Sequence, residues 1–267
     1  MTGRATTSGG WIGLYVLAYL VFLYLPVALI VLFSFNDAVQ AAFPLKGFTL
    51  SWYRALLDNE TLRGALMNSV VIGATVSVIA TLCGVTISYL EIHGRSRFAM
   101  LVSVVARLPL LIPGVVIGIA LLILVNLSGV GPSRIAIVIG HVLVALPATV
   151  IVLRGRFQSI PRSIAEAAED LGAREGVVFR RVMLPLALPA VGSAAMLAFL
   201  TSFDEFIVAF FLAGTEPTLP LYIWSQLRFP KSLPMVMALG SAILAFSILM
   251  AGGAEILRRR SPGRSPA

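Results

Sequence analysis

The feature that most constrains this sequence is a series of long apolar runs that carry almost no charge. Hydrophobic residues make up 58% of the 267 residues, and charged residues make up 12%. A typical soluble domain has about twice that charged fraction, roughly 25%. A globule of this size has too little interior to bury so much apolar surface. The sequence therefore predicts a chain whose solvent is lipid.

Six of the runs are long enough to cross a bilayer as helices. A hydrocarbon core takes about 20 apolar residues in helical form and offers backbone amides no partner. The predicted spans cover about residues 11–33, 64–90, 98–126, 135–153, 182–213 and 235–257. Charges interrupt the interior of only two of these spans, with Arg107 in the third and Asp204-Glu205 in the fifth, while Glu255 lies near the end of the sixth. We expect an all-α membrane protein that forms one transmembrane domain over residues 1–267.

The distribution of Lys and Arg predicts how the spans are oriented. One alternating set of loops and ends holds thirteen of these residues, and the other set holds six. The richer set belongs in the cytoplasm by the positive-inside rule. We therefore expect both termini in the cytoplasm and residues 154–183 as the largest cytoplasmic loop. The net charge of +8 is explained by this orientation and does not indicate nucleic-acid binding.

Residues 154–183 predict a helical hairpin between spans four and five. Pro161 or Ser163 can start a first helix, and Ser163 has capping-box spacing to Glu166. Gly172 can end that helix in a left-handed conformation. The residues that give this helix an apolar face are Ile164, Ala165, Ala168 and Leu171. An apolar face in water needs a cover. The cover is either the membrane end of the same chain or a partner protein.

A short motif in this hairpin carries a family resemblance. Glu166-Ala167-Ala168 is followed four residues later by Gly172, and Leu184-Pro185 comes twelve residues after Gly172. This sequence, spacing and position resemble the EAA loop of permease subunits of type I ABC importers. Val182 stands where that pattern usually has isoleucine. Other segments resemble the spermidine, putrescine and opine branch: Phe35-Asn36, Ser51-Trp52-Tyr53, Asn68-Ser69, Ser202-Phe203-Asp204-Glu205-Phe206 and Thr218-Leu219-Pro220.

The resemblance implies an inner-membrane importer assembled from several chains. Two permeases, usually different chains, would form the pathway, and a periplasmic binding protein would deliver the solute. An ABC ATPase dimer would bind ATP and Mg²⁺, while this chain would hold no cofactor and be no enzyme. Glu166 would anchor the hairpin in the ATPase, Ala167 and Ala168 would permit close approach, and Gly172 would make the turn. Leu184-Pro185 would join the hairpin to span five.

The chain itself carries no signature of an ATPase. A phosphate-cradling loop needs the pattern GxxxxGK[ST], and neither Lys46 nor Lys231 stands in one. The energy for transport must therefore come from a partner. An intramembrane enzyme is excluded as well, because the polar side chains are too few and too scattered for a catalytic constellation.

The charged residues inside the predicted spans suggest a solute pathway. A carboxylate at the membrane centre costs about 2.5–3.5 kcal/mol, so at least one of Asp204 and Glu205 should face water or a partner. The two acids either attract an amine-bearing solute or pair with Arg107 or a neighbouring permease. Arg107 either neutralises them or lines the pathway. Phe203 and Phe206 either pack against helices or stack on the solute.

Two positions separate this chain from typical polyamine permeases. Those proteins carry an acid after the second proline of span three, where this chain has Gly114. They also carry Pro-Glu-x-Asn before span six, where this chain has Pro234-Met235-Val236-Met237. The resemblance therefore predicts an amine-bearing solute like spermidine or putrescine. It leaves open an opine, an amino-acid derivative or another zwitterionic or anionic solute.

An ion-coupled secondary transporter is the competing class of protein. It would use Asp204 and Glu205 as coupling carboxylates and would need no ATP. The sequence shows no inverted repeat of the kind on which many secondary transporters are built. An EAA loop is also hard to reconcile with that class, so we favour the ABC permease.

Overall fold

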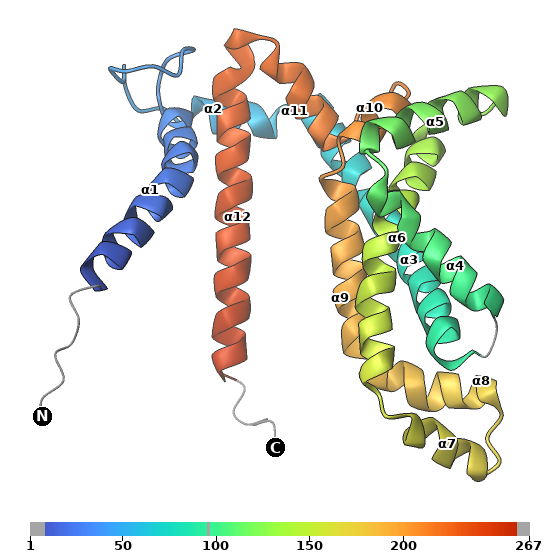
Figure 1. Ribbon diagram of the computed structural model, residues 1–267. Coiled ribbons are helices and arrows are strands. Elements are labelled where there is room, and N and C mark those ends of the chain that lie inside the picture. Colours follow the sequence, from blue (N-terminus) through green and yellow to red (C-terminus); the bar gives the residue numbers. More distant parts are fainter. Residues whose placement is uncertain (1–8, 95–96, 261–267) are drawn as a thin grey trace, which may run out of the picture. The chain divides into compact units, whose positions relative to one another are not determined.

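The computed structural model describes residues 9–94 and 97–260 of the chain. This described part is helical apart from connecting segments and one isolated bridge between Asn36 and Phe48, which confirms the predicted all-α class (Figure 1). Arg4, Arg95 and Arg264, which contribute to the predicted orientation, lie outside the described residues. The predicted topology of the termini stays a prediction.

The chain forms two compact units, Met1–Glu60 with Ile223–Ala267 and Thr61–Tyr222. The prediction of a single transmembrane domain over residues 1–267 stays a prediction. In chain order the α-helices are α1 (Gly9–Ser34), α2 (Ser51–Leu57), α3 (Glu60–His93), α4 (Arg97–Arg107), α5 (Gly114–Leu127), α6 (Arg134–Ser159), α7 (Arg162–Asp170), α8 (Glu175–Val178), α9 (Leu184–Phe203), α10 (Ile207–Leu212), α11 (Leu219–Leu227) and α12 (Leu233–Arg260). Three short helices complete the order: η1 (Leu108–Leu111), η2 (Phe179–Met183) and η3 (Pro230–Ser232).

In the first unit, α12 packs against both α1 and α2. A buried asparagine organises the loop between α1 and α2. The Oδ1 atom of Asn36 accepts a hydrogen bond from the backbone N–H of Lys46 at 2.9 Å. The backbone carbonyl of Asn36 accepts one from the indole N–H of Trp52 at 3.0 Å. The hydroxyl groups of Ser34 and Tyr53 lie 2.7 Å apart. Two segments that carry the family resemblance, Phe35-Asn36 and Ser51-Trp52-Tyr53, are therefore structural partners of each other.

In the second unit, small residues let the long helices approach closely. A Cβ atom on Gly84 of α3 would lie 2.9 Å from Oγ1 of Thr149 on α6. The Thr149 hydroxyl donates a hydrogen bond to Leu146 O at 2.7 Å and lies 3.2 Å from Ala80 O. Between apolar helices in lipid, close packing of this kind replaces the hydrophobic drive that operates in water.

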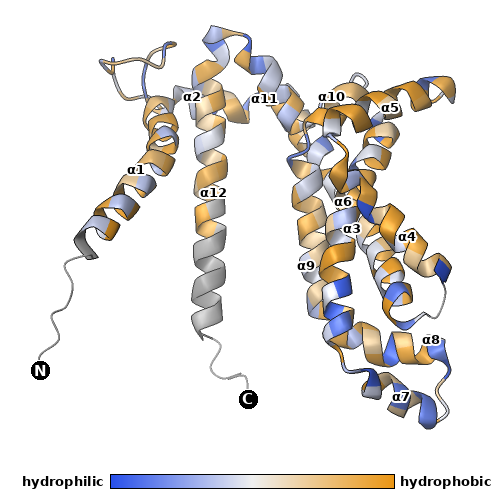
Figure 2. Ribbon diagram, in the orientation of Figure 1, coloured by the Kyte–Doolittle hydropathy of each residue, from blue (hydrophilic) through white to orange (hydrophobic). Residues whose placement is uncertain are grey.

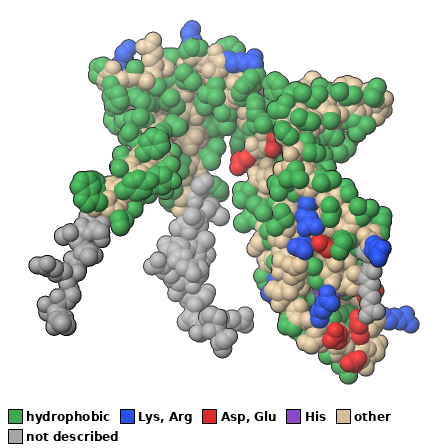
Figure 3. Space-filling view, in the orientation of Figure 1, with side chains coloured by type: hydrophobic (Ala, Val, Ile, Leu, Met, Phe, Trp, Pro, Cys, Tyr) green, Lys and Arg blue, Asp and Glu red, His purple; other side chains and the backbone are tan. Residues whose placement is uncertain are grey.

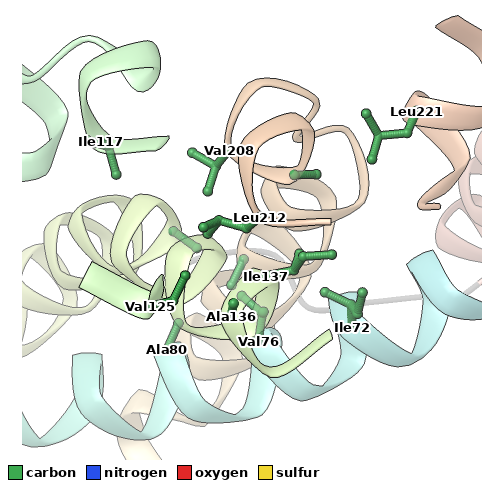
Figure 4. Packing of buried hydrophobic residues seen from close by; sticks show 13 residues of the cluster. Ile72, Val76, Ala80, Ile117, Val125, Ala136, Ile137, Val208, Leu212 and Leu221 are labelled. Atoms are coloured by element: carbon green, nitrogen blue, oxygen red, sulfur yellow. The ribbon is translucent and has the colours of Figure 1, made fainter. Parts of the chain in front are cut away.

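The short helix α10 lies between α5 and α6, and glycines receive its side chains. Gly114 and Gly118 of α5 face Ile207 and Phe211, and Gly140 of α6 faces Val208. Figure 4 shows Val208 and Leu212 directed into the buried cluster with Ile117 of α5 and Ile137 of α6. Gly114 and Gly118 form a GxxxG pattern, and this pattern thus makes a helix contact within the chain. Figure 2 shows α5 and α10 as mostly apolar.

Two of the predicted continuous spans are broken. The third splits into Arg97–Leu111 and Gly114–Leu127, which meet at 110°. Ile112 is extended there (φ −98°, ψ 127°) because the ring of a following proline disfavours the helical region. The fifth begins earlier, as one apolar helix over Glu175–Phe203, and breaks before α10.

The described residues contain four helices long and apolar enough to cross a membrane, or five with the bent pair counted as one span. The first, second and fourth predicted spans match α1, α3 and α6, and each of these helices extends beyond the predicted limits at both ends. The sixth predicted span covers residues 235–257, and part of it lies outside the residues whose side chains are described. The six-span arrangement therefore stays a prediction.

A buried carboxylate ties α4 to α3 and α6. The Glu91 side chain on α3 is 8% exposed, and its Oε1 atom lies 3.3 Å from Nη2 of Arg107 and 2.9 Å from Nε of Arg154. The hydroxyl of Ser103 donates to its other oxygen. Arg107 also donates to the Ser103 carbonyl at 2.9 Å. The network leaves no oxygen of Glu91 without a partner.

A side chain at position 140 should disrupt the packing of α10 against α6. A Cβ atom there would lie 2.6 Å from Cγ1 of Val208 and 2.8 Å from Cδ1 of Leu212. We expect Gly140→Ala to destabilise the purified protein by about 1–3 kcal/mol through overpacking, measured as a lower midpoint of thermal unfolding in detergent. Gly155→Ala, on the same helix with nothing within 4 Å, is the matched control. An equal effect of both variants would contradict this packing.

Removing the charge of Glu91 should leave two arginines in mutual repulsion. We expect Glu91→Gln to lower the unfolding free energy by about 1–3 kcal/mol, because a neutral amide cannot satisfy three charged or polar donors. The exposed Arg134–Glu216 pair, with side chains 49% and 63% exposed, provides the control. Glu216→Gln should cost no more than about 1 kcal/mol. Thermal unfolding of the two variants side by side tests the difference.

Candidate functional site

The predicted hairpin is present, and a glycine closes its first helix as the sequence indicates. Gly172 adopts φ +84°, a conformation that costs other residues about 1 kcal/mol or more. The N–H of Gly172 bonds to Glu169 O at 2.8 Å and the N–H of Ala173 to Ala168 O at 3.0 Å. This pair of bonds is a Schellman motif. At the other end α7 begins directly after Pro161 and no side chain caps it. Of the two predicted starts, the helix therefore uses Pro161, and the Ser163 cap does not form.

The chain covers only part of the apolar face of α7. Ala165 is buried and Ala168 is packed against a cluster that includes Leu153, Phe157 and Met183. Leu171, at the turn, is 90% exposed. Ile164 on α7 and Val177 on α8 are 38% and 42% exposed. Half of the expected apolar stripe is therefore held by the chain's own membrane helices, and the other half is open.

The hairpin is rigidly joined to the long helix that follows it. The segments α8, η2 and α9 run without interruption over Glu175–Phe203. Residues 179–183 form a π-helical stretch just before Pro185, whose ring lacks the N–H that an α-helix would use. Met183 in this stretch is fully buried. A force on the hairpin would thus act directly on α9.

Charged side chains surround the open part of the hairpin. Figure 3 shows Lys, Arg, Asp and Glu gathered at the α7–α8 end of the second unit. The exposed charged residues of this end include Arg162, Glu166, Glu169, Asp170, Arg174, Glu175, Arg180 and Arg181. Glu166 and Ala167 of the motif are exposed. An apolar spot rimmed by charges is typical of a protein interface.

The two acids of the fifth span lie at the break between α9 and α10. Asp204 ends α9 and is exposed, whereas Glu205 is half-buried. The Oε1 atom of Glu205 accepts a hydrogen bond from the N–H of Val208 at 3.0 Å, which satisfies a free amide at the start of α10. Within residues 9–94 and 97–260 the Asp204 carboxylate has no ion pair or side-chain hydrogen bond. The break therefore gives the two acids different surroundings.

The expected pairing of Arg107 with Asp204 or Glu205 is wrong, because Arg107 binds Glu91 instead. Sequence reasoning missed this partner. One signal could have found it, since Glu91 is the only acidic residue between Glu60 and Glu166. The side chain of Arg107 therefore forms its ion pair with Glu91 and not with the two acids at the break. Its predicted place in the pathway stays a prediction.

The aromatic residues at the break contact other aromatic rings. Phe203 stacks on Phe199, with ring centroids 5.6 Å apart. Phe206 and Phe210 lie 5.8 Å apart, and Phe206 also packs against the core cluster around Val208. These contacts agree with packing, and stacking on a solute stays a prediction.

A buried histidine contacts the last turn of α9. The sequence predicts interhelical hydrogen bonds for His141 and Asn126. His141 Nδ1 lies 2.8 Å from Oγ of Ser202, which confirms the first. Asn126 is exposed and donates to Leu122 O of its own helix, so the second prediction is wrong.

Two further segments of the family resemblance also bind each other. The Nδ2 atom of Asn68 donates to the carbonyl oxygens of Glu216 and Pro217, both at 3.1 Å. The hydroxyl of Ser69 accepts from the N–H of Leu219 at 2.8 Å. Asn68-Ser69 therefore holds the loop that leads into α11, and the match of these positions reflects a structural need.

Comparisons with known proteins agree with this architecture. The chain is 30% identical to the spermidine/putrescine transport system permease protein PotC of Escherichia coli over 97% of its length and 96% of that protein. It is 31% identical to the putrescine permease protein PotI of E. coli over 84% of this chain and 82% of that protein. It is 32% identical to the molybdenum permease protein ModB of Mycobacterium bovis over 81% of this chain and 90% of that protein.

A solved structure shares the fold. A bacterial ABC transporter involved in the import of the acidic polysaccharide alginate contains a chain that superposes with a TM-score of 0.71, at 18% identity, over 98% of this chain and 100% of that one. The family model described as "Binding-protein-dependent transport system inner membrane component" matches residues 47–261. The resemblance found in the sequence is thereby confirmed. The chain belongs to the inner-membrane permease components of binding-protein-dependent ABC transport systems.

Proposed function

We propose that this chain forms half of the solute pathway of an ATP-driven importer, and that its hairpin couples the pathway to a separate ATPase. A second permease, two ATPase subunits and a periplasmic binding protein complete the machine. The observation that carries the proposal is the open apolar spot on the hairpin, Ile164, Leu171 and Val177, with the motif residues Glu166 and Ala167 exposed in the same segment.

The geometry of the hairpin suits it to transmit force. Ala165 and Ala168 fix α7 to the membrane helices, so the hairpin cannot swing alone. The helix from Glu175 to Phe203 is continuous and ends at Asp204. An ATPase that closes on ATP would move hairpin and α9 together and would shift the break at Asp204. Such a switch requires the ATPase to bind the two states of the permease with different free energies.

Asp204 is the residue that we assign to contact with the solute. It is exposed at a helix break, and Glu205 beside it already accepts a backbone hydrogen bond. A carboxylate without a protein partner at membrane depth favours a cationic or amine-bearing solute. Glu205 remains next to the pathway with one carboxylate oxygen uncommitted by the Val208 bond.

We infer an amine-bearing solute like spermidine or putrescine, because the relatives PotC and PotI are permeases of spermidine/putrescine and putrescine transport systems. An opine, an amino-acid derivative or an anionic solute is the alternative. The similar identity to a molybdenum permease means that overall likeness does not fix the solute. Gly114, in place of an acid, packs against Ile207 of α10, and thus the position has a structural use in this chain.

The hairpin assignment predicts loss of ATPase binding from single substitutions. We expect Leu171→Arg and Glu166→Arg each to reduce co-purification of the transporter's ATPase about tenfold or more, as for a central interface residue. The amount of chain in the membrane should not change. Leu57→Arg, at a leucine that is 80% exposed on α2, and Glu216→Arg are matched controls. Full ATPase binding by both hairpin variants would remove the coupling proposal.

The pathway assignment predicts different responses at the two acids. In bacteria that lack their own polyamine importers and express the complete transporter, Asp204→Asn should lower uptake of radiolabelled spermidine or putrescine about tenfold, because a charged hydrogen bond is lost. Glu205→Gln should lower it less, since an amide oxygen still accepts from Val208. Both variants should keep ATPase binding. Unchanged uptake by Asp204→Asn would assign the carboxylate to structure, and absence of polyamine uptake by the unmodified transporter would favour the alternative solutes.

A further inference from the structure

The acidic break is held from both sides by neighbouring residues of α6. His141 binds Ser202, two residues before Asp204, at 2.8 Å. Gly140, adjacent to His141, receives Val208 and Leu212 of α10. The carbonyl of Ser202 also accepts from the N–H of Glu205 at 3.4 Å. One turn of α6 therefore fixes the chain before and after Asp204.

The hydrogen bond between His141 and Ser202 lies in an apolar setting. His141 is 1% exposed and Ser202 is 4% exposed. The second ring nitrogen of His141, Nε2, is buried and has no hydrogen-bond partner among the described residues. A buried polar atom without a partner costs about 1–3 kcal/mol. An unpaired buried group of this kind calls for an explanation, and a functional role is one such explanation.

We propose that His141 and Ser202 are positioning residues that set the direction of the Asp204 carboxylate toward the solute. This inference rests on the assignment of Asp204 to the pathway. Without the hydrogen bond, the last turn of α9 loses this polar contact with α6, while α10 still packs against Gly140. The carboxylate then samples more directions, and binding of an amine, which depends on direction, weakens.

A labelling experiment on the purified full chain tests positioning without any solute. In a background with Cys83→Ser and Asp204→Cys, the rate of reaction with a cationic methanethiosulfonate reports the surroundings of position 204. We expect Ser202→Ala to change this rate about fivefold, and His141→Ala to do the same. His141→Asn, whose amide nitrogen stands close to the place of Nδ1, should restore the original rate.

Two controls separate positioning from a general loss of structure. Ser193→Ala removes a hydroxyl from α9 that bonds only within its own helix and should leave the rate unchanged. A cysteine in place of the exposed Glu216 should react equally in all backgrounds. An unchanged rate at position 204 in Ser202→Ala, or an equal change at position 216, would overturn the proposal.

Transport provides the second test. We expect Ser202→Ala to lower uptake of radiolabelled spermidine or putrescine about threefold to tenfold, the range of one hydrogen bond, and less than twofold when Asp204→Asn is already present. Residues that act through one another are non-additive in this way. Additive losses would overturn the positioning role and leave the pathway role of Asp204 intact. No loss in Asp204→Asn alone would instead overturn the pathway assignment, and the labelling result would still decide whether His141 and Ser202 position residue 204.

Discussion

The close packing of α6 against its neighbours supports the rest of the second unit. Thr149 meets Gly84 of α3, Gly140 receives α10, and Arg154 binds Glu91 beside α4. At its far end, Arg156 donates to the Leu186 carbonyl of α9 at 2.6 Å and 3.1 Å. Because lipid supplies no hydrophobic drive between apolar helices, these steric and polar contacts determine where the hairpin and the acidic break lie.

A polar atom in an apolar setting needs a local partner, and several charged groups of the second unit have one. Glu91 is paired with two arginines and a serine, and Glu205 accepts from the amide of Val208 at the start of α10. Among the described residues several buried polar atoms have no partner, and the Nε2 atom of His141 is one of them. The Asp204 carboxylate, which is exposed, has none among these residues either. His141 and Asp204 belong to the same helix break, because His141 contacts Ser202 two residues before Asp204.

The hairpin and the break differ in how far the sequence predicts them. Gly172 could be read as a helix end because a left-handed residue favours glycine. Pro109 and Pro113 are a local signal for a bend in span three, although the predicted span is continuous. Between Gly192 and Gly214, however, there is no glycine or proline, and thus nothing local marks the break at Asp204. That break depends on the packing of α10 against the glycines of α5 and α6, which are distant from α10 in the sequence.

The sequence by itself determined the solvent of this protein, its helical class and its family, because apolar runs and the motif from Glu166 to Pro185 are local patterns. Only the tertiary structure decided which charges meet. In the folded chain Arg107 pairs with Glu91 rather than with the acids of span five. Leu171 is exposed, whereas Ala165 is buried. The reason is physical: a partner choice depends on distances between helices, and these are set by the fit of small and large side chains across the whole unit.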